Sequence, residues 1–282
     1  MRNETLKRWL ITYGPLAAAL VLEIIVFELI GRSRGAPGFA SVNGLILVLN
    51  QSVVIGVMAV GMTFVILTGG IDLSVGSLMA FGGVLCAMAV DKGGGPVLLW
   101  MLAGYVIALA AGGAIGGAIG VLVTRFGIPP FIATLAFMSS LRGVGNLITG
   151  GKPVSPLPDA YDWLGRYQVG GQVPVSVLIF LAILAVSAVL LGHTKFGRHV
   201  RAIGGNEESA RLSGVNVNRV KLLVYVLNSA LTIVAGLILS ARLGAGSPKV
   251  GVGDELAVIA AVVVGGTSLS GGRGTIGGTF MG

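Results

Sequence analysis

The sequence predicts an all-α fold, a polytopic bundle of transmembrane helices in which some helices are broken. Of the 282 residues, 54% are hydrophobic and only 11% are charged, and the mean hydropathy is +0.93. A soluble domain of this length would carry more charge on its surface. The apolar runs are continuous rather than alternating, which excludes a transmembrane β-barrel. The chain is therefore expected to fold within a membrane by packing helices against one another.

Apolar runs along the chain predict the helices. A helix needs roughly 20 residues to cross a hydrocarbon core of about 30 Å, and most of the runs reach that length. They are residues 10–30, 42–68, 97–123, 131–149, 173–191, 222–243 and 256–264. The last run is too short for an ordinary span, and so is a further run, residues 75–90. Both short runs lie close to glycine pairs, which predicts broken helices at these places.

The first run, residues 10–30, is predicted to be a retained helix rather than a secretory signal. It is longer than a typical signal core, and no small-residue cleavage site follows it. It also contains Glu23 and Glu28. We expect these carboxylates to reach the membrane interface or to pair with Arg32 or Arg34.

The distribution of Lys and Arg predicts the orientation of the chain. If the helices alternate from a cytoplasmic N-terminus, the inside segments hold eleven basic residues and the outside segments six, in agreement with the positive-inside rule. The inside residues are Arg2, Lys7, Arg8, Arg125, Lys195, Arg198, Arg201, Arg211, Arg219, Lys221 and Arg273. The outside residues are Arg32, Arg34, Lys92, Lys152, Arg166 and Lys249. The formal charge of +8 follows from this bias, and no aromatic or basic groove supports a nucleic-acid partner.

The segment GGAIGGAIG, residues 112–120, predicts a tight helix contact. It places Gly112, Gly116 and Gly120 at a spacing of four on one helix face. Small residues at this spacing let a neighbouring backbone approach closely. The partner helix is expected inside the same subunit, and a contact between two subunits of a dimer is the alternative.

Two similar segments predict an internal repeat. GGIDLSVG, residues 69–76, and GGTSLSGG, residues 265–272, each follow an apolar run and lie 196 positions apart. Paired glycine-broken segments in two halves of a membrane protein indicate a transport pathway.

Four long segments resemble a known family. They are VGMTFVILTGGIDLSVGS at residues 60–77, PPFIATLAFMSSLRG at 129–143, TKFGRHVRAIGGNEESARLSGVNVNRVK at 194–221, and ELAVIAAVVVGGTSLSGGRGTIGG at 255–278. In this order they resemble the permease subunits of ribose- and xylose-type ABC importers. The resemblance covers nearly the whole chain from Asn43 onward.

The resemblance implies a function and a set of partners. The chain would be a non-enzymatic subunit of the bacterial inner membrane that forms the pathway for a monosaccharide such as ribose or xylose. A periplasmic sugar-binding protein would deliver the sugar, a separate cytoplasmic ATPase would drive transport, and a second permease subunit would form a homodimer. The family's chains continue through further helices after GGRGTIGG, residues 271–278. Residues 1–282 are therefore expected to form a single transmembrane permease domain that lacks the family's C-terminal helices.

The segment LSGGR, residues 269–273, resembles the nucleotide-contacting LSGGQ motif of ABC ATPases, but it does not predict ATP binding. The chain has no G-x-x-x-x-G-K-[ST] motif to cradle phosphates. ATP is therefore expected on the separate ATPase, and no cofactor is expected here. The single cysteine, Cys86, supplies neither a disulfide nor a metal framework.

The polar stretch of residues 193–221 contains a predicted short helix. An N-cap, two acidic residues at the positive end of the helix dipole and a terminal glycine mark its bounds. The resemblance implies that this helix couples the permease to its ATPase by entering a cleft on that subunit. From the residues alone, a solvated basic loop is an equal alternative. The expected coupling residues are Asn206, Glu207, Glu208, Arg211 and Gly214.

Polar residues in or beside the apolar runs are candidates for the sugar pathway, because their side chains can bind sugar hydroxyls. They are Asp72, Ser74, Asn50, Gln51, Asn146 and Asn228. Arg142 is another polar residue within a run. For each residue taken singly, a hydrogen bond between helices is the expected role. For Asp72 we expect a cap on the short helix that follows, with contact to the substrate as the alternative.

Functions of other classes fit the sequence less well. A secondary transporter needs ionisable residues in its spans for ion coupling, and the two histidines, His193 and His199, both lie in the basic loop. An intramembrane enzyme needs a clustered acid, base or nucleophile, and no such spacing is recognisable. The same architecture importing a nucleoside or a signalling sugar is the alternative that remains open.

Overall fold

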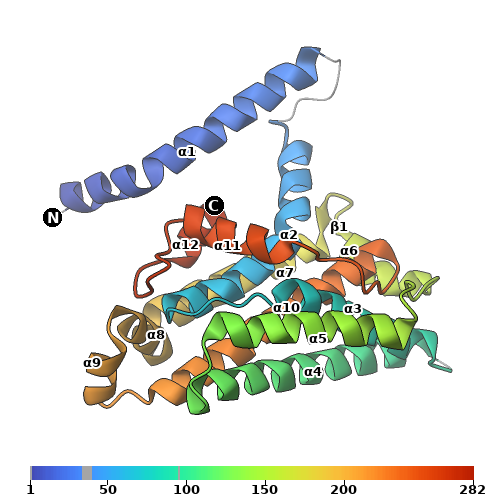
Figure 1. The fold of residues 1–282 in the computed structure, drawn as a ribbon. Helices are drawn as coiled ribbons and strands as arrows, with labels where there is room; N and C mark the ends of the chain where they lie inside the picture. The colour runs from blue at the N-terminus through green and yellow to red at the C-terminus, as the bar shows by residue number, and fades with distance from the viewer. Residues whose placement is uncertain (1, 34–39, 95) are drawn as a thin grey trace.

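The structure, a computed structural model, describes residues 2–33, 40–94 and 96–282, with side chains at residue 14 and from residue 18 onward (Figure 1). This part of the chain is mostly helical. The helices are α1 (Arg2–Ser33), α2 (Val42–Leu67), α3 (Val75–Asp91), α4 (Val97–Arg125), α5 (Pro130–Thr149), η1 (Asp159–Asp162), α6 (Trp163–Arg166), α7 (Val175–His193), α8 (Lys195–Gly205), α9 (Glu207–Leu212), α10 (Val217–Leu243), α11 (Asp254–Val264) and α12 (Ile276–Met281). Two short antiparallel strands, β1 (Gln168–Val169) and β2 (Val173–Pro174), form a hairpin before α7.

The predicted helices are present, with small differences at their ends. Among the described residues, α2, α4, α5, α7 and α10 are long and apolar enough to span a membrane. α10 begins at Val217, before its predicted run, because Oδ1 of Asn216 accepts a hydrogen bond from the N–H of Arg219 at 3.0 Å and so caps the helix. The two short runs form α3, of 17 residues, and α11, of 11 residues.

α1 covers the first predicted run and lies at the edge of the bundle, beside α12 (Figure 1). Glu28 forms an ion pair with Arg32 at 2.7 Å, which confirms one of the pairings expected from the sequence. Arg34, the other expected partner, lies outside the described residues. The side chains of Arg2, Lys7 and Arg8 are also outside them.

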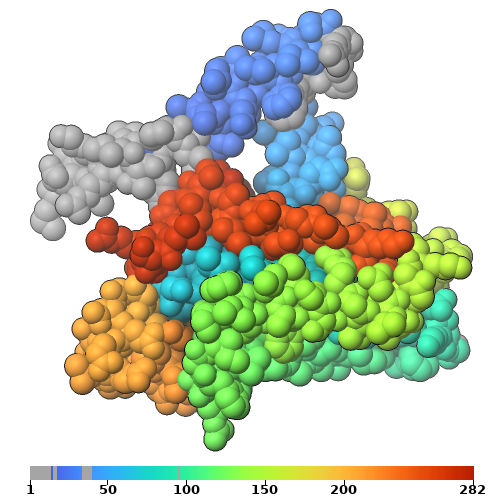
Figure 2. Space-filling model, viewed as in Figure 1, coloured from blue at the N-terminus to red at the C-terminus, as the bar shows by residue number. Residues whose placement is uncertain are grey.

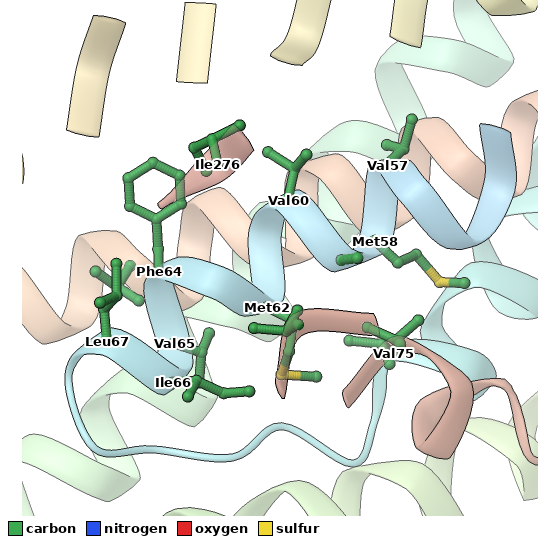
Figure 3. Packing of buried hydrophobic residues seen from close by; sticks show 14 of the residues in the cluster. Val57, Met58, Val60, Met62, Phe64, Val65, Ile66, Leu67, Val75 and Ile276 are labelled. Carbon is green, nitrogen blue, oxygen red and sulfur yellow. The ribbon is translucent and has the colours of Figure 1, made fainter. Parts of the chain in front are cut away.

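The core is built on α10 and on the second half of α2. α10 packs against α2, α3 and α4, and every residue of α2 from 57 to 67 is buried. Figure 3 shows this stretch of α2, with side chains such as Met58, Met62 and Phe64 pointing in different directions around the helix. A helix that is apolar on all sides belongs in the interior of a bundle. The second half of α2 therefore lies in the interior of the bundle, against α10.

The glycines of GGAIGGAIG form the predicted tight contact, and the partner is α10 of the same chain. A Cβ at Gly116 would lie 2.6 Å from the carbonyl O of Tyr225. A Cβ at Gly120 would lie 2.9 Å from Cα of Leu222, and Gly112 faces α10 in the same way. The expected contact within one subunit is therefore confirmed, and these three positions are not available to a second subunit.

Candidate transport pathway and coupling surface

The connection between α2 and α3, residues 68–74, is called the elbow here, and it is built around a buried carboxyl group. Oδ1 of Asp72 accepts hydrogen bonds from the N–H of Ser74 at 2.8 Å and from its Oγ at 2.6 Å. Oδ2 accepts one from Nδ2 of Asn228, on α10, at 2.8 Å. All three residues have no exposed surface. A buried carboxyl group is costly unless hydrogen bonds satisfy it, so these bonds hold the elbow against α10.

Asp72 stabilises the start of α3, as the sequence predicts, although it is not itself the N-cap residue. The N-cap of α3 is Ser74, and Asp72 lies two residues before it. The carboxyl group therefore accepts a hydrogen bond from the N–H of the N-cap residue, one of the free N–H groups at the start of the helix. Because Asp72, Ser74 and Asn228 are completely buried, they do not line an open path in this conformation.

Packing against the middle of α2 and a hydrogen bond to α5 also fix the position of the elbow. A Cβ at Gly61 on α2 would lie 2.5 Å from Oδ1 of Asn228, so the amide fits there only because residue 61 is glycine. On the other side, the N–H of Leu73 donates to Oγ1 of Thr134 on α5 at 3.1 Å. Three long helices therefore fix the position of the elbow.

Asn50 lies in a second polar cluster, in the first half of α2. Its Oδ1 accepts hydrogen bonds from Oγ of Ser176 on α7 and from Nη2 of Arg242 on α10, each at 3.0 Å. Asn50 also lines a cavity of about 450 Å³ between α2 and the β1–β2 hairpin. The other amide side chains of its lining are Asn43, Gln168 and Gln172. Amides both donate and accept hydrogen bonds, which suits a ligand rich in hydroxyl groups.

The remaining two candidates join neither cluster. Gln51 lines a second, mostly apolar cavity of about 540 Å³ between α2, α7 and α12. Asn146 donates from Nδ2 to the carbonyl O of Arg142, one turn earlier in α5, at 2.9 Å. The structure therefore brings together three of the six candidates, Asp72, Ser74 and Asn228, and leaves the others in separate places.

Arg142 on α5 fixes the extended segment between α10 and α11, residues 244–253. Its Nη1 donates to the carbonyl O of Pro248 at 2.8 Å and of Val250 at 2.6 Å, and its Nη2 donates to the carbonyl O of Gly251 at 3.2 Å. The sequence identifies Arg142 only as a polar residue in an apolar run. The acceptors could not be predicted, because they are backbone groups more than 100 residues away in the chain.

Segment 244–253 leads directly into the broken helix α11. The carbonyl O of Gly251 lies so close to α3 that a Cβ at Gly76 would overlap it. The segment ends at Gly253, whose φ of +87° turns the chain into α11 at Asp254. The first turns of the two short helices, α3 and α11, therefore lie side by side. In Figure 2 the segment and α11 lie above α5 on the same face of the molecule.

The predicted short helix in the polar stretch is α9, and its ends are as expected. Oδ1 of Asn206 accepts from the N–H of Ser209 at 2.8 Å, which makes Asn206 the N-cap. At the other end the N–H of Gly214, with φ of +83°, donates to the carbonyl O of Arg211 at 3.0 Å. The N–H of Val215 donates to the carbonyl O of Ala210 at 3.1 Å, which completes a Schellman motif.

Glu207 attaches α9 to the start of α10. Its carboxylate pairs with Lys221 at 2.5 Å and with Arg211 at 3.1 Å. The hydrogen bond from Lys221 lowers the pKa of Glu207, and the two positive charges add to this effect. Glu208 lies beside it in the first turn of α9 and is exposed.

The outer surface of α9 carries an exposed apolar side chain that sequence reasoning missed. Leu212 is 81% exposed, although it lies between the charged Arg211 and a polar turn. Ala210, on the opposite side of the helix, is buried against the bundle. A leucine in an otherwise polar stretch is a sequence signal that could have identified this surface. α8 and α9 together project from one end of the bundle (Figure 1).

The two segments of the predicted repeat form similar turns, which lie next to each other. After α2, the N–H groups of Gly69 and Gly70 bond back to α2, and after α11 the N–H groups of Gly266 and Thr267 do the same. The left-handed residues are Gly69 and Gly266, so the two turns differ by one position from the sequence match. The N–H of Gly272, in LSGGR, donates to the carbonyl O of Leu67 at 3.0 Å.

Comparisons with known proteins agree with this architecture. Residues 44–282 match the family described as the permease component of the branched-chain amino acid transport system. The chain is 44% identical over 285 aligned residues to the ribose import permease protein RbsC of Escherichia coli (strain K12), an alignment that covers all of this chain and 85% of that protein. The match to RbsC of Bacillus subtilis (strain 168) is 43% identical and covers 95% and 80% of the two chains.

A third relative, the xylose transport system permease protein XylH of Escherichia coli (strain K12), is 37% identical over 83% of this chain and 74% of that protein. No solved structure matches the chain. The family match covers most of this chain, and the alignments cover 74 to 85% of the relatives' own length. The chain belongs to the family of membrane permease components that includes the ribose and xylose permeases.

Proposed function

We propose that this chain is the membrane-spanning permease subunit of an ABC importer for ribose or a closely related monosaccharide. The observation that carries the proposal is the 44% identity to the ribose import permease over the whole chain. The similarity to a xylose permease favours pentoses as the substrate class. The chain itself performs no chemical reaction in this proposal, and a separate cytoplasmic ATPase supplies the energy.

The exposed surface of α9 is the part of the chain that would bind this ATPase. Leu212 offers an apolar side chain, and Arg211 and Glu208 offer charges of both signs at the same exposed end. A few residues that fill well-packed pockets of the partner typically carry most of the binding energy of an interface. The cap at Asn206 and the turn at Gly214 hold the short helix in shape for this contact.

The proposal includes the remaining partners, which are those expected of this family, and an orientation that the charge distribution supports. A periplasmic sugar-binding protein delivers the sugar, and a second copy of this chain completes the pathway in the bacterial inner membrane. The N-terminus and the α8–α9 segment lie in the cytoplasm, as the excess of basic residues there favours. With the native Cys86 buried, Ser209→Cys should react with a membrane-impermeant thiol reagent only after spheroplasts are broken. Labelling in intact spheroplasts would contradict this orientation.

The candidate pathway residues divide into two groups in this proposal. The amide-lined cavity at Asn50 is the better candidate for contact with the sugar, because its amide groups face an open space. Asp72, Ser74 and Asn228 instead position the elbow between α2 and α3, because they are buried and bonded to each other.

Sugar uptake tests the proposed function. The chain would be expressed with the ATPase and binding protein of its transporter in cells that lack a ribose permease, and uptake of radiolabelled ribose would be measured. We expect uptake that is lost when the ATPase is inactivated, and stronger competition by xylose than by a nucleoside. Uptake that continues without an active ATPase would contradict the proposal in favour of secondary transport. Competition by the nucleoside alone would assign the substrate to the other class.

A further inference from the structure

We propose that the end of α8 and the loop between α11 and α12, residues 265–275, form a rigid joint that transmits movement of α9 to the broken helix α11. The joint consists of Gly204 at the end of α8 and of Gly271 and Gly272 in the loop. The inference rests on the proposed function, because it takes α9 as the part that binds the ATPase.

The joint is a contact between backbones. A Cβ at Gly204 would overlap both the carbonyl O of Leu67, the last residue of α2, and the N of Gly272. The N–H of Gly272 donates to that same carbonyl O at 3.0 Å. This bond satisfies one of the free carbonyl groups at the end of α2. The end of α8 therefore lies on the point where α2 and the loop are bonded together, with no side chain between them.

The loop meets α8 through residues in the left-handed conformation. Gly271 and Gly272 have φ of +84° and +74°. A Cβ at Gly271 would lie 2.9 Å from Cα of Gly204 and 3.1 Å from the N of Gly69, the first glycine of the elbow. The joint thus brings α8 into contact with both segments of the predicted repeat.

The loop is attached firmly to α11. The N–H of Ser268 donates to the carbonyl O of Arg273, and the N–H of Gly271 donates to the carbonyl O of Ser268, each at 2.9 Å. The N–H of Thr267 donates to the carbonyl O of Val262 in α11 at 3.1 Å. These bonds close the loop on itself and fix it to the end of the helix. The loop and α11 therefore move together.

α8 and α9 are also joined tightly. Asn206 is the one residue between them, and its N–H donates to the carbonyl O of Ala202 in α8 at 3.0 Å, while its side chain caps α9. A displacement of α9 therefore moves the end of α8. Coupling over such distances passes through packed elements that keep their internal structure.

The far end of α11 is the part that this movement would displace. α11 has 11 residues, which corresponds to a length of about 16 Å, and its first turn lies against the start of α3 at Gly76. Segment 244–253, held by Arg142, precedes it directly. A movement that begins at α9 would therefore reach the place inside the bundle where the two short helices meet.

One pair of variants tests the joint in the complete transporter, reconstituted in proteoliposomes with its ATPase and binding protein and with ribose as the substrate. Gly204→Ala inserts a methyl group into the joint, whereas Gly205→Ala adds the same group where nothing lies within 4 Å. We expect both variants to bind the ATPase like the wild type. Uptake should fall at least about fivefold for Gly204→Ala, the lower range of typical couplings between sites, and be unchanged for Gly205→Ala. Normal uptake by Gly204→Ala with normal ATPase binding would overturn the inference.

A cross-link that holds the joint closed is the complementary test, because Gly204→Ala disrupts the joint. This test can be used even if Gly204→Ala fails to assemble. Gly205→Cys and Ser270→Cys would be linked by a flexible bifunctional maleimide, with the native Cys86 buried. Because a rigid joint moves as one body, linked transporters should take up ribose at the unlinked rate. Each single-cysteine variant, treated with the same reagent, serves as the control. Loss of uptake in the linked double variant, with normal uptake in both controls, would mean that the joint must open and would overturn the inference. Failure of the wild-type chain to bind any ATPase would instead contradict the proposed function.

Discussion

Nδ2 of Asn228 donates a hydrogen bond to Oδ2 of Asp72 at 2.8 Å, although the two residues are 156 positions apart in the chain. The bond joins the central helix α10 to the elbow between α2 and α3. Both residues are completely buried, and the other oxygen of the carboxyl group is satisfied by Ser74. The elbow is therefore held by a polar cluster within an otherwise apolar core.

Removing the amide of this pair should destabilise the protein. Asn228→Ala leaves a buried carboxyl oxygen without its donor, which costs about 1 to 3 kcal/mol. The unfolding temperature of the purified protein in detergent should fall accordingly. Asn218→Ala, at an exposed position at the start of the same helix, serves as the control and should leave it unchanged. Equal unfolding temperatures for the two variants would show that the bond does not hold the elbow.

The glycines of α4 predict a difference between two neighbouring substitutions. Gly116→Leu forces a side chain into the backbone of α10, whereas Gly117→Leu points into open space. Overpacking of this kind costs about 1 to 3 kcal/mol, and sometimes more. Gly116→Leu should therefore lower the unfolding temperature and broaden the elution profile in size-exclusion chromatography, while Gly117→Leu should behave like the wild type. Equal tolerance of both substitutions would contradict the α4–α10 contact.

Arg142 should control the mobility of segment 244–253. Its planar guanidinium reaches three carbonyl groups at once, whereas a lysine ammonium is a compact charge on a flexible stem. Arg142→Lys should therefore increase amide hydrogen exchange in residues 244–256, as measured by mass spectrometry. Arg219→Lys, at an exposed position of α10, should not. Unchanged exchange in Arg142→Lys would mean that the segment is held by other contacts.

The positions of the helices could be predicted from the sequence because each long apolar run has a local cause. The run of residues 42–68, for example, appears as α2, which ends at Leu67. The cap at Asn206 could also be predicted, because its side chain binds an N–H group only three residues further along the chain. Local patterns of this kind do not depend on what the segment packs against.

The candidate site could be predicted only in part, because its contacts connect distant segments. The sequence marks Asp72 and Asn228 as polar but does not indicate that they bond to each other. It marks the glycines of α4 as a packing surface, and their partner α10 emerges only when the bundle is assembled. LSGGR resembles a nucleotide motif, yet its glycines contact the end of α8. Backbone contacts of this kind leave no pattern in the side chains.

The most direct test of the account is the binding of the ATPase to α9. Leu212→Asp places a charge on a side chain that is 81% exposed, so the fold of the membrane bundle is not disturbed. The variant and the wild type would be purified from membranes that contain the ATPase, and the amount of ATPase that co-purifies would be measured. Asn218→Asp introduces the same charge at another exposed position and serves as the control.

We predict that Leu212→Asp reaches normal abundance in the membrane and loses at least about tenfold in ATPase binding, since burying an unpaired carboxylate in the interface costs more than the roughly 1.4 kcal/mol that corresponds to a tenfold loss. Ribose uptake should fall with it, and Asn218→Asp should keep both activities. If Leu212→Asp retained full ATPase binding and full uptake, α9 would not be the coupling surface, and the proposed route from the ATPase to the broken helices would be contradicted.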